Sequence, residues 1–81
     1  MFRKLVKASE IEVDGIRYTL RFYELKTIRG GQRFSCEVHL AAADRFILDD
    51  DSMSSLESKV ARLAPATVYS RLLAARPSVA A

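Results

Sequence analysis

The spacing of apolar residues in the first half of the chain is the feature that most restricts its fold. From Glu10 to Val13, and again from Ile16 to Leu25, apolar side chains alternate with polar ones. The dipeptide Asp14-Gly15 separates the two runs. It favours a two-residue hairpin turn, because both turn positions need a positive φ angle. The pattern therefore predicts two antiparallel strands, one ending near Val13 and one covering about 16–25.

Two further strands follow from the same reasoning. A second turn is expected at 28–32, where two glycines are adjacent, and alternation then resumes from Arg33 to Leu40. The short run from Arg45 to Leu48 is a candidate fourth strand at a sheet edge. The sequence thus predicts three or four strands joined by short turns.

After Leu48 the apolar period changes to that of a helix, with a stripe that begins at Met53 and Leu56. Pro65 has no backbone N–H, so it either kinks one helix or begins a second that ends near Ala75. We therefore predict an α+β fold: an antiparallel three- or four-stranded meander sheet, followed by one kinked helix or two C-terminal helices packed on one face. Residues 1–76 form a single domain in this interpretation, and residues 77–81 form a frayed C-terminal tail.

Three consecutive aspartates, Asp49 to Asp51, suggest a metal site at first sight. Consecutive side chains on an extended chain point in opposite directions, and the calcium-loop spacing of alternating acidic residues before a glycine is absent. The same segment lies where a strand ends and the helical stripe begins. Carboxylates there can accept helix N–H groups and face the positive end of the helix dipole. We expect the aspartates to serve the helix start, with Asp51 or Ser52 as the cap.

No combination of residues in the sequence suggests catalysis. The chain has one cysteine and one histidine, Cys36 and His39, and their spacing on a strand places them on opposite faces. The serine-nucleophile pattern G-x-S-x-G and the phosphate-binding loop pattern are both absent. We predict that the protein is not an enzyme and has no catalytic, cofactor-binding or metal-binding residues.

Charge is segregated along the sequence. Residues 1–33 carry eight Lys/Arg against four Asp/Glu, residues 34–60 carry two against six, and residues 61–81 carry three Arg and no acid. Such segments can pair within one fold or between copies. A chain of 81 residues also builds only a small core, so self-association would add burial. The leading hypothesis is a small interaction module that forms a homodimer and binds an unidentified protein partner.

The alternative hypothesis is a nucleic-acid-binding domain. If helices cover one face of the sheet, the other face carries arginines beside a tyrosine, which can meet phosphates and stack on a base. The glycine turn between the second and third strands adds flanking arginines. The residues expected to bind are Arg17, Arg21, Tyr23, Arg29 and Arg33.

The location expected from the sequence is cytoplasmic. No apolar run reaches the ~20 residues that a membrane-spanning helix needs, and the first ten residues do not have the pattern of a signal peptide. A lone cysteine is typical of a reducing compartment. We expect no contact with a membrane.

Overall fold

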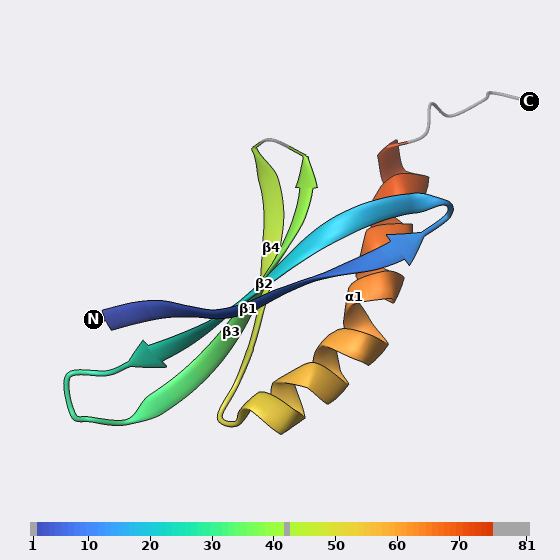
Figure 1. The fold of residues 1–81 in the computed structure, drawn as a ribbon. Coiled ribbons are helices and arrows are strands. Elements are labelled where there is room, and N and C mark those ends of the chain that lie inside the picture. The colour runs from blue at the N-terminus through green and yellow to red at the C-terminus, as the bar shows by residue number, and fades with distance from the viewer. Residues whose placement is uncertain (1, 42, 76–81) are drawn as a thin grey trace, which may run out of the picture.

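The computed structural model describes residues 2–41 and 43–75, which form an antiparallel sheet followed by a helix (Figure 1). The strands are β1 (Phe2–Val13), β2 (Ile16–Lys26), β3 (Gln32–Ala41) and β4 (Asp44–Asp50), and the helix is α1 (Met53–Ala75). The strands lie in sequence order, β1-β2-β3-β4, each antiparallel to the next. The α+β prediction is confirmed, and both open alternatives are resolved: within the described residues the meander has four strands and is followed by one helix.

The β1–β2 hairpin has the predicted turn. Asp14 and Gly15 both have positive φ, at 54° and 79°, and Val13 pairs with Ile16 across them. Positive φ at both central positions is the type I′ geometry that matches the twist of the flanking strands. The β2–β3 turn is also glycine-dependent, since Gly30 has φ 80° and the amide of Gly31 donates to Thr27 Oγ1 at 3.0 Å.

Strand β1 begins at Phe2, eight residues before Glu10, where the alternating pattern of the sequence starts. The register with β2 shifts between Leu5 and Lys7, which leaves Val6 as an extra residue in a β-bulge. The extra residue interrupts the alternation of side chains from one face to the other. A period-two pattern therefore could not be followed through the first half of β1.

Helix α1 continues through Pro65 to Ala75. Its buried residues recur every fourth position, at Leu56, Val60, Ala64 and Val68. Four residues advance about 40° beyond a full helical turn, so the buried stripe winds around the helix and suits a diagonal crossing of a twisted sheet. An interior proline destabilises a helix by about 3 kcal/mol. The buried residues before and after Pro65 hold both parts of α1 against the sheet, which offsets this cost. The expected stop at Pro77 and the frayed tail lie outside the described residues.

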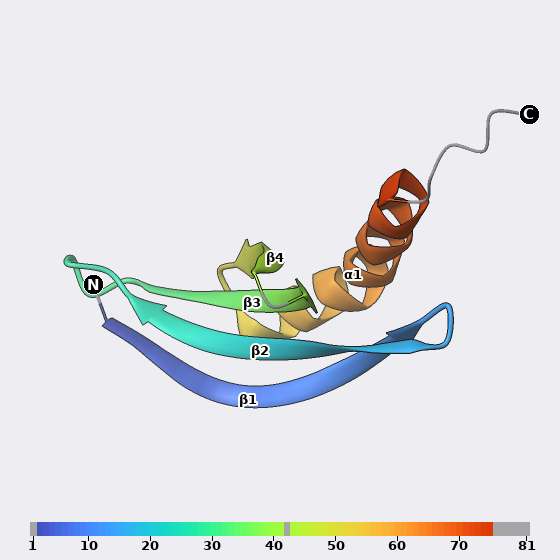
Figure 2. The same cartoon turned by 90° about the horizontal axis from the view of Figure 1, so that it is seen from above.

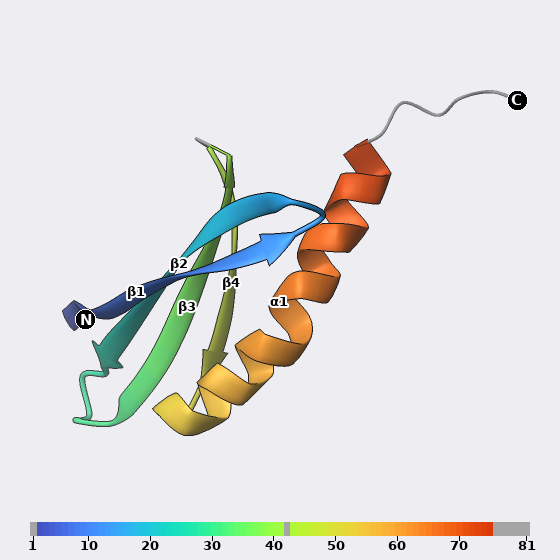
Figure 3. The same cartoon turned by 45° about the vertical axis from the view of Figure 1, so that its right-hand side comes forward.

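The core lies between α1 and one face of the sheet. The sheet contributes buried side chains from three strands, and Cys36 and Val38 of β3 are fully buried. Figure 3 shows α1 along this side, with no described segment covering the other side. We call that other side the open face; its residues include Arg17, Thr19, Arg21, Tyr23, Ser35, Glu37 and His39. No helix within the described residues is long and apolar enough to cross a membrane.

Candidate interaction face

Glu37 is the central residue of the open face. It lies in the middle of β3, and its side chain is only 5% exposed although no helix covers it. Its carboxylate is closed in by two cations, Arg3 at 2.8 Å and Arg45 at 3.5 Å, and by the imidazole of His39, whose Nε2 lies at 3.6 Å. Side chains from β1, β3 and β4 thus shield one carboxylate from solvent.

Tyr23 of β2 completes this cluster. The Arg3 guanidinium carbon lies 3.8 Å from the centroid of the Tyr23 ring, which is cation–π geometry. Arg3 therefore contacts both an aromatic ring and a carboxylate. The contact fixes the first part of β1 to the middle of the sheet.

Opposing effects act on the pKa of Glu37. Burial alone would raise this pKa, because it disfavours the charged form. The charge and hydrogen bond of Arg3, the charge of Arg45 and a hydrogen bond from Tyr23 act the other way, and the pKa is lowered overall. Glu37 is therefore a stable carboxylate at neutral pH, and a weak proton acceptor.

Apolar side chains surround the cluster. Leu5, Val6 and Ile47 are each about half exposed, at 52%, 47% and 56%. A hollow of about 240 Å³ lies beside Ile47; it is lined by Arg3, Leu25, Ser35, Glu37, Ile47 and Asp49. Fixed Arg and Tyr side chains together with exposed aliphatic groups are typical of protein–protein interfaces.

Four of the five residues predicted to bind nucleic acid lie on the open face: Arg17, Arg21, Tyr23 and Arg33. Arg29 lies in the β2–β3 turn, at the opposite end of β2 from Arg17, so the five residues do not form one patch. Two of them already have partners. Tyr23 is covered by Arg3, and Arg33 pairs with Asp49 at 3.3 Å and with Asp51. Arg17, Arg21 and Arg29 make no ion pair within the part of the chain that the structure describes.

The segregated charges seen in the sequence pair largely within the chain. Pairs join the basic first third to the acidic middle, as in Arg3–Glu37 and Lys7–Glu57 at 3.2 Å. Arg71 of α1 reaches back to Asp44 at 2.8 Å. These bonds attach β1 and α1 to the rest of the sheet, and they neutralise most of the acidic segment.

Sequence reasoning did not identify Arg3, Glu37 or Ile47 as members of this site. The position of Arg3 depends on the bulge, which no sequence pattern indicates. Ile47 could have been found, because Phe46, Ile47 and Leu48 are consecutive and a strand must turn one of three such residues to the other face. The burial of Glu37 depends on side chains from three strands that meet only in the folded sheet.

The three aspartates form ion pairs beside the helix start, and the cap is Ser52. The amide of Ser55 donates to Ser52 Oγ at 3.2 Å, and the amide of Leu56 donates to the Ser52 carbonyl at 3.0 Å. Asp49 and Asp50 belong to the end of β4. Among the described residues there is no group of three or more His, Cys, Asp or Glu side chains that could hold a metal ion.

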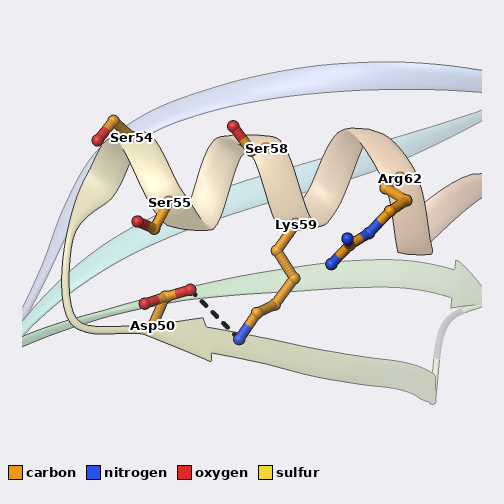
Figure 4. Close-up of a pocket in the computed structure, with 6 residues that line it drawn as sticks. All are labelled: Asp50, Ser54, Ser55, Ser58, Lys59 and Arg62. Atoms are coloured by element: carbon orange, nitrogen blue, oxygen red, sulfur yellow. Dashed lines mark ion pairs between the residues drawn. The ribbon is translucent and has the colours of Figure 1, made fainter.

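A second hollow, of about 510 Å³, lies between β4 and the first turns of α1; it is lined by Asp50, Ser54, Ser55, Ser58, Lys59 and Arg62 (Figure 4). Lys59 pairs with Asp50 at 3.3 Å and donates to the carbonyl of Asp49 at 2.7 Å. Figure 4 shows Ser54 and Ser58 pointing away from this pair. The polar groups do not converge on one point, so we assign no ligand to this hollow.

No family model matches the chain, and neither a curated protein nor a solved structure matches it. Its function is therefore inferred from its own residues and contacts.

Proposed function

We propose that the protein is a non-enzymatic interaction module that associates with a second copy of itself. One observation carries this proposal: the described residues expose as many large apolar side chains as they bury. Eight are exposed: Leu5, Val6, Ile16, Ile28, Ile47, Leu63, Tyr69 and Leu73. The buried core has ten residues, of which Cys36 and Ala64 are small, so eight large ones remain. A small domain buries only a modest fraction of its surface on folding. A dimer interface would cover part of this exposed apolar set and so add burial.

The exposed residues are grouped on the surface. Leu5, Val6 and Ile47 lie on or beside the open face around the Glu37 cluster. Tyr69 and Leu73 are one helical turn apart on α1. Grouped apolar side chains favour association more than scattered ones do.

The state of the titratable groups supports a non-enzymatic role. The lowered pKa of Glu37 makes it a poor general base, because such a base works best with a pKa near the working pH. Burial raises the pKa of Cys36 to about 11, so its sulfur is a thiol at neutral pH and a weak nucleophile. Neither group has the properties expected of a catalytic residue.

Measuring the mass in solution tests the proposal. In sedimentation velocity over a hundredfold range of protein concentration, we expect the average mass to rise from 9.1 kDa toward twice that value. The melting temperature should rise with concentration, because association stabilises only the folded state. A constant monomer mass with a melting temperature independent of concentration would contradict self-association.

A second candidate function is binding to a nucleic-acid backbone. It is favoured by Arg17, Arg21 and Arg29, whose charges are not neutralised by ion pairs within the described residues. If all three contacted phosphates of a duplex, log K would fall with log salt with a slope of about −2.7. An amide-shift titration with single-stranded and duplex oligonucleotides at low salt tests this function. The absence of shifts at residues 16–35 would rule it out.

A further inference from the structure

Strand β1 forms an unpaired edge of the sheet. It has 12 residues, its sheet partner is β2, and residues 3–10 are all exposed. Figure 2 shows no described segment beyond β1 on its outer side. A long edge presents backbone N–H and C=O groups that can pair with another strand.

The charges of β1 are divided between its two halves. Arg3, Lys4 and Lys7 lie in the first half, and Glu10 and Glu12 lie in the second. When two copies of one strand pair in antiparallel fashion about a two-fold axis, the first half of each lies opposite the second half of the other. The basic half of β1 would therefore meet the acidic half of its partner, and opposite charges across strands are favourable.

Three of these charges have no ion-pair partner in the part of the chain that the structure describes. They are Lys4, Glu10 and Glu12. Most of the other acidic side chains are held within the fold, as described above for Glu37, Glu57 and the aspartates. The acidic end of β1 is thus available to a second molecule.

We propose that two copies associate by pairing β1 with β1 in antiparallel fashion. This rests on the proposed function and supplies its interface. Because the bulge at Val6 shifts the alternation, Arg3 and Leu5 share the open face with Ala8 and Glu10. Among the registers that keep same-face residues opposite each other, two place Arg3 against an acidic residue, which is Glu10 in one and Glu12 in the other. The first register also places Leu5 against Ala8, whereas the second places Leu5 against Glu10, so we assign the first.

The other edge of the sheet does not suit the same pairing. Strand β4 has acidic residues at both ends, Asp44 at one and Asp49 and Asp50 at the other. A full-length antiparallel pair of β4 strands would place Asp44 of each copy opposite Asp50 of the other. Like charges placed opposite each other oppose pairing, so β4 is protected while β1 is complementary to itself.

Antiparallel pairing about a two-fold axis keeps corresponding faces on the same side. The two α1 helices would cover one side of a continuous sheet formed by both copies. The two open faces would join on the other side, with the two Glu37 clusters in one surface. The dimer would thus present a larger surface than either copy alone.

A single charge reversal tests the interface against a matched control. Glu10→Lys replaces two attractive cross-strand pairs of the dimer by two repulsive ones, so the dissociation constant should rise by about tenfold or more. Glu24→Lys makes the same change in net charge on β2, away from the edge, and should change the constant by no more than about twofold. Glu10 is exposed, and unfolding curves of both variants check that the fold is kept.

The outcomes separate the two proposals. A wild-type dimer that is weakened by Glu10→Lys and not by Glu24→Lys supports β1 pairing. A wild-type dimer that is equally tight in Glu10→Lys overturns β1 pairing and leaves self-association standing. A wild-type protein that stays monomeric at every concentration overturns self-association itself.

Disulfide trapping tests the register. Leu5→Cys and Ala8→Cys are made in separate chains and mixed under mild oxidation; the native Cys36 can remain because it is buried. Opposed residues bring their Cβ atoms near the distance that a disulfide needs. We expect a covalent heterodimer from the mixture and little covalent dimer from either chain alone. Equal cross-linking in all three samples, or none in the mixture, would overturn the assigned register.

Discussion

The guanidinium of Arg3 contacts both the ring of Tyr23 and the carboxylate of Glu37, 3.8 Å from the ring centroid and 2.8 Å from Glu37 Oε1. The three residues belong to β1, β2 and β3. One cation therefore links three strands on the face that has no helix. Neighbouring side chains shield the Glu37 carboxylate, whereas the Arg3 side chain is 48% exposed, and the ion pair attaches the first part of β1 to the sheet.

The cluster predicts a pH dependence that Glu37→Gln should remove. The pKa of Glu37 is lowered in the folded state from an ordinary value of 4.5, so its stabilising contribution is complete above pH 4.5 and is lost as the pH falls through the folded pKa. At neutral pH we expect the variant to be less stable by about 1–3 kcal/mol. Urea unfolding across a pH series should show this difference shrinking in acid. A difference that stays constant throughout would contradict the assignment.

Two leucines of α1 should differ widely in their effect on stability. Leu56 is fully buried and Leu63 is 37% exposed. Leu56→Ala should cost about 2–5 kcal/mol of unfolding free energy, because it removes buried contacts and leaves a cavity. Leu63→Ala is the control and should cost much less. Similar losses in denaturant unfolding would mean that the helix packs on a different face.

The start of α1 should depend on Ser52 more than on its neighbours. Ser52 Oγ accepts the amide of Ser55, so Ser52→Ala should reduce stability by about 0.5–2 kcal/mol. Ser54→Ala removes a hydroxyl that makes no hydrogen bond within the described residues, and it serves as the control. Thermal unfolding of both variants measures the difference. A larger loss for Ser54→Ala would place the cap elsewhere.

Cys36 should be unreactive in the folded protein. It is fully buried, and burial raises its pKa to about 11, so at neutral pH it is a shielded thiol. A thiol reagent should label it only as fast as the protein opens, and immediately in denaturant. Rapid labelling of the native protein would contradict both the burial and the raised pKa.

The aspartates at the end of β4 should not respond to divalent cations. Asp49 and Asp51 both bind Arg33, and Asp50 binds Lys59, so all three carboxylates are already paired with cations of the chain. Adding Mg²⁺, Ca²⁺ or Mn²⁺ should leave the melting temperature unchanged, because a ligand of the folded state would raise it. A rise that disappears in Asp49→Ala/Asp51→Ala would establish a metal site.

The parts of the fold that depend on residues close together in the sequence were predictable. The Asp14-Gly15 turn, the alternation in β2 and β3 and the helical stripe around Leu56 each depend on neighbours in the sequence. Sequence reasoning left open whether Pro65 divides the helix, because the answer depends on burial on both sides of it. The first half of β1 was missed because its side chains do not alternate regularly.

The candidate site was less predictable than the fold. The sequence correctly grouped Arg17, Arg21, Tyr23 and Arg33 on one face, since that needs only strand period and register. It could not show that Arg33 and Tyr23 already have partners, because those contacts join residues distant in the chain. For Glu37 the shielding side chains, Arg3 and Arg45, come from different strands.

The bulge at Val6 also bears on how this chain tolerates changes in length. Leu5 pairs with Tyr23 and Lys7 pairs with Phe22, which are adjacent in β2, so Val6 is the one residue of β1 with no counterpart. Deleting it would leave an uninterrupted strand in which Arg3 and Leu5 still face the same way. Deleting Leu5 or Lys7 would also remove the bulge, but Val6 would then take the place of the deleted side chain opposite β2. Position 6 is therefore the place in β1 where related chains can differ by one residue and keep the same arrangement of charges.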